Sequence, residues 1–125
     1  MLKNISVFIL GGLALTAVAA HAADVEVRCE RRIAPARSRV SVDVRNIASG
    51  TYAAAIQSGT NSAISPLAGT IGDEVAFDFD SNPKDVRAGA TAISKTFIQG
   101  NTVTAQIVNA ANQIVAQGAG VCRVR

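Results

Sequence analysis

The residues in this chain best suited to chemistry are oxygen ligands that alternate along one short stretch. Calcium is a hard cation that takes several oxygen ligands, and aspartates at alternate positions followed by an amide resemble the opening of a calcium loop. The candidate ligands are Asp78, Asp80, Asn82 and Asp85. An EF-hand is excluded, because Pro83 and Gly89 occupy the positions of its invariant Gly and bidentate Glu. A calcium site of another kind stays a hypothesis; the competing interpretation is a solvated strand face that runs into a helix cap.

Arginine is concentrated near the two ends of the chain, and its guanidinium group binds phosphate and carboxylate groups in a two-pronged geometry. The set comprises Arg28, Arg31, Arg32, Arg37, Arg39, Arg45, Arg123 and Arg125. These residues predict a contact surface for an acidic protein, an acidic polysaccharide or anionic lipid headgroups. Two alternatives stay open: arginines that only keep edge strands from pairing, and head-to-tail self-association with the acidic run.

Catalysis and nucleic-acid binding are not expected. The single histidine, His21, falls in a predicted export signal, and its removal takes away the commonest general base and zinc ligand. Ser-His and Cys-His nucleophile systems are then excluded. The few aromatic residues lie mostly at core-facing positions, which leaves no stacking platform for bases. A small hydrolase that works with carboxylates is retained only as a remote alternative.

The first 22 residues have the three parts of an export signal. Lys3 gives the positive start, residues 5–20 are almost entirely apolar, and Ala20-His21-Ala22 is a small-x-small cleavage site. A membrane anchor is the competing interpretation, but a spanning helix needs about 20 apolar residues. We therefore expect cleavage after Ala22, a periplasmic or extracellular location, and a single domain over residues 23–125.

The elements that carry the candidate residues begin and end with cysteine-bearing strands. Cys29 and Cys122 are the two cysteines of the chain, and both lie in stretches that alternate apolar and charged residues. Two cysteines in an exported protein most often form a disulfide, whereas buried free thiols are the alternative. Closing so long a loop removes denatured-state entropy worth about 4–5 kcal/mol. The sequence therefore predicts that the first and last strands are covalently joined.

Between the cysteines the apolar period is two, which is the signature of half-buried strands. The predicted strands cover about residues 25–32, 40–45, 51–58, 74–79, 90–98, 102–107 and 113–125. Asn82 as N-cap, Pro83 at the first position and Asp85 in the first turn predict a short helix that ends near Ala88. Strands spaced by roughly ten residues indicate a small antiparallel β-sandwich of about seven strands, immunoglobulin-like in architecture.

These observations favour an exported, non-enzymatic binding or structural module that uses its arginine-rich face. The alternative is a calcium-stabilised accessory or adhesion-type domain that uses the acidic run of residues 78–85. Apart from that calcium ion, no cofactor is expected.

Overall fold

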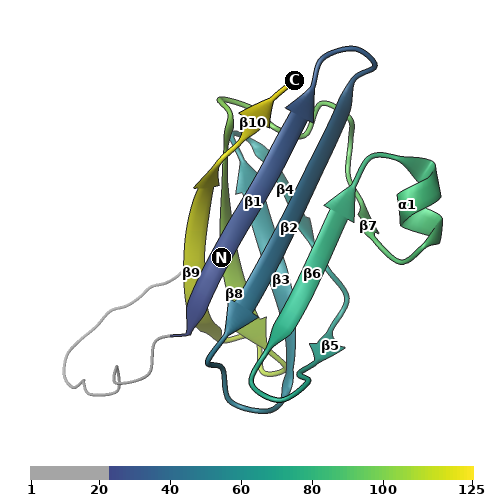
Figure 1. The fold of residues 1–125 in the computed structure, drawn as a ribbon. Coiled ribbons are helices and arrows are strands. Elements are labelled where there is room, and N and C mark those ends of the chain that lie inside the picture. The colour runs from purple at the N-terminus through teal and green to yellow at the C-terminus, as the bar shows by residue number, and fades with distance from the viewer. Residues whose placement is uncertain (1–22) are drawn as a thin grey trace.

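The alternating pattern makes most of the chain into strands, and the computed structural model describes residues 23–125 as two stacked β-sheets (Figure 1). The predicted signal and cleavage site lie outside the described residues. The elements are β1 (Asp24–Arg32), β2 (Arg37–Arg45), β3 (Thr51–Ser58), β4 (Asn61–Ile64), β5 (Ala68–Gly69), β6 (Val75–Asp80), α1 (Pro83–Arg87), β7 (Thr91–Ala92), β8 (Thr102–Asn109), β9 (Ile114–Val121) and β10 (Arg123–Val124).

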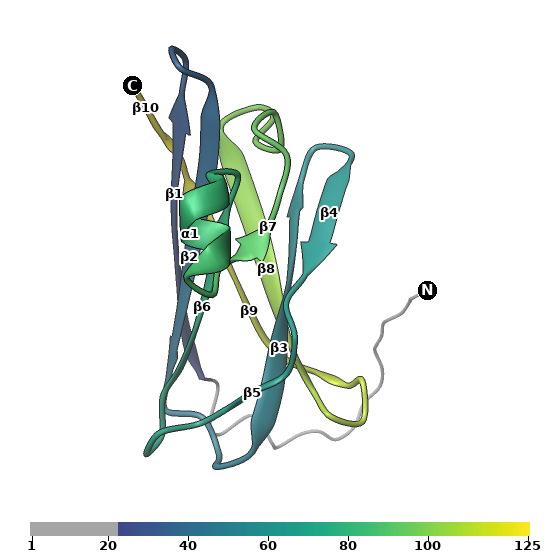
Figure 2. The same ribbon diagram turned by 90° about the vertical axis from the view of Figure 1, so that its right-hand side faces the viewer.

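The first layer, sheet A, has the strand order β10-β1-β2-β6-β7. The second layer, sheet B, has the order β4-β3-β8-β9, and β5 pairs with the start of β3. Figure 2 shows the two layers nearly edge-on, with α1 beside sheet A. The all-β sandwich predicted from the strand period is therefore confirmed.

The prediction of purely antiparallel sheets is wrong. In the structure β10 runs parallel to β1, and β7 runs parallel to β6. Both exceptions follow from the connections. The chain passes from β9 to β10 without reversing direction, and α1 is a crossover that returns the chain in the direction of β6. Three further short strands, β4, β5 and β10, raise the number of strands in residues 23–125 to ten, in place of about seven.

The strand predicted over residues 90–98 is wrong in its length, because only Thr91–Ala92 pairs. The rest is a loop in which the Phe97 amide donates to the carbonyl of Ser94. Phe97 and Ile98 are nevertheless buried, so the apolar period there comes from core packing by a loop. The predicted helix is confirmed, with the Asn82 side chain accepting a bond from the Lys84 amide.

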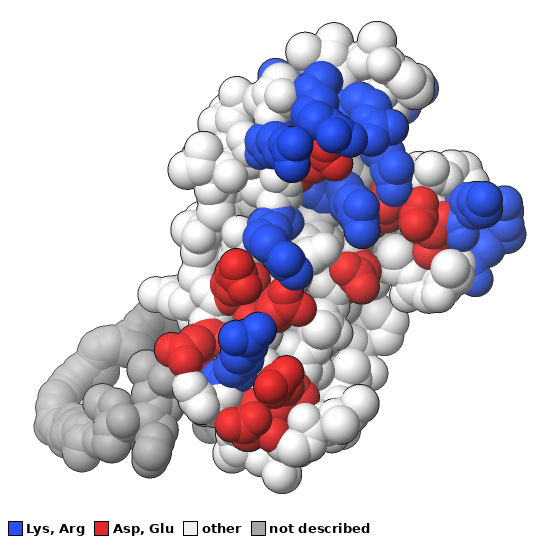
Figure 3. Space-filling view, viewed as in Figure 1, with Lys and Arg blue, Asp and Glu red and all other residues white. Residues whose placement is uncertain are grey.

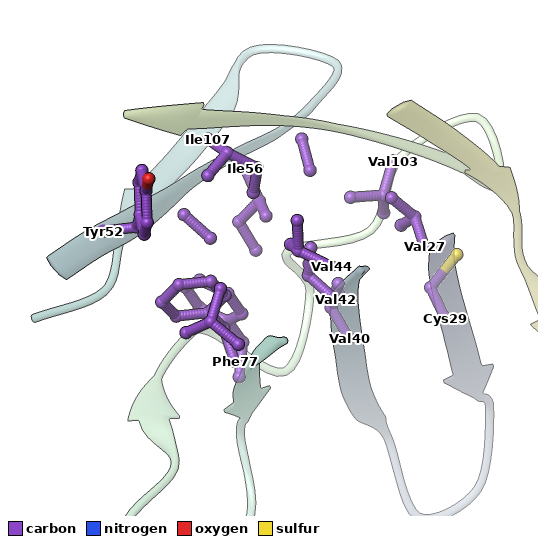
Figure 4. Packing of buried hydrophobic residues seen from close by; sticks show 14 of the residues in the cluster. Val27, Cys29, Val40, Val42, Val44, Tyr52, Ile56, Phe77, Val103 and Ile107 are labelled. Atoms are coloured by element: carbon purple, nitrogen blue, oxygen red, sulfur yellow. The ribbon is translucent and has the colours of Figure 1, made fainter. Parts of the chain in front are cut away.

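The core lies between the two sheets and is built from inward positions of long strands. Val40, Val42 and Val44 of β2 point toward Ile56 and Ile107 of sheet B (Figure 4). All five side chains are at most 1% exposed. Burying a side chain of this size stabilises a fold by roughly 1.5–3 kcal/mol. Packing between the sheets therefore contributes a large part of the stability of the fold.

The two sheets meet at a corner where β9 lies against β1. The sulfur atoms of Cys29 and Cys122 are 2.05 Å apart, so the predicted disulfide is confirmed. Just before Cys122, a Cβ atom on Gly120 would lie only 2.2 Å from the Val27 carbonyl oxygen, and one on Gly118 would lie 2.8 Å from that of Val25. Only glycine permits such a close approach of two backbones. The corner therefore depends on both the glycines and the disulfide.

Candidate functional site

The outer side of sheet A carries most of the predicted arginines. Strand register places Glu30 opposite Arg123 on one side and Arg39 on the other, and it places Arg28 opposite Ser41. Five arginines share this side at the β10 end and are here called the arginine face: Arg28, Arg32, Arg39, Arg123 and Arg125. Figure 3 shows the basic side chains gathered in the upper half of this side and most of the acidic ones below them.

Ion pairs on the arginine face join an exposed arginine to a partly covered carboxylate. Arg125 Nε lies 2.5 Å from Glu30 Oε2, and Arg28 Nη2 lies 2.6 Å from Asp43 Oδ2. The two arginine side chains are 48% and 64% exposed, so these pairs add little stability and can exchange partners. No ion pair joins Arg32 or Arg123 to another of the residues that the structure describes.

A shallow hollow of about 460 Å³ opens in the middle of the arginine face. Its lining consists of Val27, Arg28, Cys29, Glu30, Arg39, Ser41, Val121 and Arg123. Three guanidinium groups thus border one concave surface, with a single carboxylate among them. Such a hollow suits anionic groups that project from a larger partner, because guanidinium pairs with carboxylate, sulfate or phosphate oxygens in two parallel hydrogen bonds.

Arg37 does not belong to this exposed set, although the sequence grouped it there. Its Nε lies 3.0 Å from Asp80 Oδ1 and its Nη2 lies 2.7 Å from Asp80 Oδ2. The same Nη2 lies 3.0 Å from Asp85 Oδ2 in α1. The Asp80 side chain is 4% exposed and that of Arg37 20%. This Arg37–Asp80–Asp85 network fastens the short helix to the end of sheet A, and its role is structural.

The charge on Asp80 is stabilised by its partners. Burial by itself would raise the pKa of Asp80, but the hydrogen bond from Arg37, the bond from the Asn82 amide and the nearby guanidinium charges outweigh burial. The net result is a pKa below the ordinary value of 3.8. Asp80 is therefore an ionised structural group at neutral pH, with its oxygens already engaged.

The four predicted calcium ligands do not converge on one point. Asp80 and Asp85 both bind Arg37, whereas Asp78 accepts a bond from Ser41 on the outer side of sheet A. The Asn82 side chain caps α1. Within residues 23–125 no group of three or more His, Cys, Asp or Glu residues is placed to hold a metal ion. The calcium hypothesis stays a prediction, and a guanidinium already sits between two of its ligands.

Two further arginines lie apart from the arginine face. Arg31 has the inward parity of Val27 and Cys29, and its Nε donates to Asn101 Oδ1 at 3.0 Å. The alternation itself could have separated Arg31 from its neighbours, since it falls on the core side of the strand. Arg45 pairs in register with Asp24 at the opposite end of sheet A. The predicted set of eight arginines thus divides into five on the arginine face and three elsewhere.

Sequence reasoning also passed over a feature of the other layer. Residues 46–72 and 96–122 contain no Asp, Glu, Lys or Arg, and together they supply every strand of sheet B. Two long stretches without a charged residue could have shown from the sequence alone that one sheet is uncharged.

Comparison with models of protein families, with curated proteins and with solved structures gives no match for this chain. No helix within residues 23–125 is long and apolar enough to cross a membrane. Functional conclusions therefore depend on the chemistry of the two sheets.

Proposed function

We propose that this chain is an exported, non-enzymatic binding module whose arginine face contacts a partner surface rich in anionic groups. The observation that supports this proposal is the convergence of Arg28, Arg39 and Arg123, from three strands, around one open hollow. The disulfide contributes directly, because it holds Cys122 beside β1 and so positions the following Arg123. A surface built in this way presents several guanidinium groups from strands whose spacing is fixed, on exposed side chains that can adjust to a partner.

The chemistry of the face favours binding over catalysis. Residues 23–125 contain no histidine, and both cysteines are in the disulfide. Outside the hollow, Asp80 and Asp85 are both paired with Arg37. Within its lining the Glu30 carboxylate is paired with Arg125 and the Ser41 hydroxyl donates to Asp78, whereas the guanidinium groups suit charge-assisted hydrogen bonds.

We further propose an immunoglobulin-like arrangement and a location outside the cytoplasm. In support of the first, β1, β2 and β6 lie in one sheet while β3, β8 and β9 lie in the other, which follows the division of strands in such sandwiches. In support of the second, a disulfide persists in oxidising compartments and is rare in the cytosol.

The test is binding of two soluble polyanions, dextran sulfate and poly-glutamate, to the purified protein. Removing two guanidinium groups in the variant Arg39→Gln with Arg123→Gln should weaken binding at least about tenfold, because each charge-assisted hydrogen bond contributes about 1.5–3 kcal/mol. The matched control, Arg45→Gln with Arg87→Gln, changes the net charge equally but lies away from the hollow.

Salt provides the second arm of this test. Binding should weaken steeply from about 0.1 M to about 1 M salt, since the screening length falls from about 10 to about 3 Å. Equal losses in the two double variants would show that only net charge matters, and retention unchanged in high salt would rule out the arginine face as the contact surface.

A further inference from the structure

The outer side of sheet B carries no charged residue, and most of it is exposed apart from the pair Ala53 and Val108. About a quarter of the residues in an average protein are charged. The described stretches that form sheet B, residues 46–72 and 96–122, have none. Outer positions on surface strands are where charged residues normally prevent unwanted association. Their absence over a whole sheet is therefore informative.

Strand register defines this surface, here called the uncharged face. One row across the sheet places Ile64, Ala55, Gln106 and Gln117 side by side, and the next places Ser62, Gln57, Thr104 and Ala119 side by side. Most of these side chains are exposed, and only Ala55 is partly covered. The centre is thus made of small residues, hydroxyls and amides, which lie flat on the sheet and can approach another surface closely.

Apolar side chains lie around this centre. Ile64 on β4 is 56% exposed, and Ile114 on β9 is 46% exposed. Ile114 begins β9 at one edge of the sheet, while Ile64 ends the strand at the other edge. These apolar side chains are dispersed singly, so the absence of charge, not a hydrophobic patch, distinguishes this surface.

We propose that the uncharged face binds the same face of a second copy of this chain, giving a two-fold symmetric dimer with sheet B packed on sheet B. Charge favours this partner. A face without ionised groups meets its own copy with no like-charge repulsion and no charge to desolvate, whereas packing the outer side of sheet A would bury many ions. In a two-fold contact the amides of Gln57, Gln106 and Gln117 can donate to and accept from their counterparts.

The available area is sufficient for a reversible dimer. Three strands of eight residues and one of four, at about 3.3 Å per residue and about 4.8 Å between strands, cover roughly 440 Å². Two copies would bury roughly 900 Å² in total, which is the size of a weak, transient interface. We therefore expect a dimer that forms at micromolar concentration and dissociates on dilution. Because sheet A faces away from this contact, the dimer would display two arginine faces on opposite sides.

The proposal does not depend on the arginine face and is tested separately. Sedimentation velocity of the purified protein over a range of concentrations should show a monomer–dimer equilibrium. Ala119→Arg places a charge on the β9 side of the uncharged face, where the contact leaves it unpaired, and should raise the dimer dissociation constant at least about tenfold, because an unpaired charge is costly to desolvate. The control is Ala76→Arg, which adds the same charge at an exposed position on the outer side of sheet A.

Gln106→Arg is a second variant in case Ala119→Arg perturbs the fold, and circular dichroism checks both. The dimer should persist in high salt, because no ion pair holds it. Dissociation in high salt, or a loss caused by Ala76→Arg instead of Ala119→Arg, would overturn the proposal in favour of head-to-tail contact through sheet A. A protein that is monomeric at every concentration also overturns it; retention of that monomer on a neutral glucan resin would indicate a neutral polysaccharide as the occupant.

Discussion

The two broad faces of this sandwich share one strand period and differ completely in their outward chemistry. On sheet A the outward positions of β1 and β2 are mostly arginine, aspartate or glutamate, as in Glu30 and Arg39. On sheet B the equivalent positions are threonine, glutamine, serine and alanine, as in Thr104 and Gln106. Inward positions are alike in the two sheets, because both pack against the same core. The inward half of the pattern thus determines the fold, and the outward half divides the possible functions between the two faces.

The largest loss of stability is expected from changes at the corner where the disulfide joins the two sheets. Replacing both cysteines, Cys29→Ala with Cys122→Ala, should lower the free energy of unfolding by about 4 kcal/mol, because the denatured chain regains the entropy of an open loop. Urea denaturation of the oxidised protein and of this variant measures the difference. A loss below about 1 kcal/mol would mean that the packing of Gly118 and Gly120 against β1 is enough to hold the charged and uncharged layers together.

A smaller but still large loss is expected for Arg37→Ala. This change leaves the Asp80 carboxylate, whose side chain is 4% exposed, without its main partner. Removing one member of a buried pair costs about 3 kcal/mol or more. The matched control is Arg39→Ala, since the Arg39 side chain is 55% exposed and its Nε is 4.0 Å from Asp80. Similar losses in the two variants would contradict the distinction between structural and exposed arginines on sheet A.

The same network sets a pH dependence. The pKa of Asp80 is below 3.8 in the folded protein, so the unfolded chain takes up this proton at a higher pH than the folded protein does. The stabilisation is therefore complete above the unfolded pKa and is lost as the pH falls through the folded pKa. The stability difference between wild type and Arg37→Ala should shrink as the pH falls below about 4, as measured by thermal melting. A difference that is constant down to pH 2 would show that Asp80 keeps no depressed pKa.

The smallest loss of stability is expected from replacing an arginine on the arginine face. Arg28→Ala breaks the pair with Asp43, but the Arg28 side chain is 64% exposed. Exposed pairs contribute about 0.2–1 kcal/mol, so urea denaturation should show little change. Polyanion binding should nevertheless weaken, because Arg28 lines the hollow. Gln106→Ala on the uncharged face is the matched comparison, with neither stability nor polyanion binding expected to change.

Local chemistry made part of this structure predictable. The helix cap at Asn82 and Pro83 and the alternation in β2 follow from short-range rules, and the disulfide follows from the presence of just two cysteines in a chain expected to be exported. The parallel pairing of β10 was not predictable, because it depends on how β9 crosses the corner with Gly118 and Gly120 against β1. The strand predicted over residues 90–98 was too long for a related reason: a loop can bury Phe97 and Ile98 as well as a strand can.

The candidate site was predictable only in outline. The sequence identified the residue type, since arginine recurs on the first and last strands. It did not separate Arg37 from its neighbours, because its partners Asp80 and Asp85 lie more than 40 positions away and meet it only through the pairing of β2 with β6. Arg31 differs, since its parity with Cys29 alone marks it as inward. Partners far apart in the sequence can be identified only when the strand register is known. The side of a strand on which a residue lies can be predicted from the alternation of the sequence itself.

The covalent link between the first and last strands also changes what a protease can do to this protein. Cys29 and Cys122 are 93 positions apart, so nearly all of residues 23–125 lie inside one closed ring. A single cut in an exposed turn, such as the one around Gly72, opens the ring without releasing a fragment. Both pieces stay attached through sulfur and remain paired in the same sheets. Only a second cut, or reduction of the disulfide, allows a piece to leave.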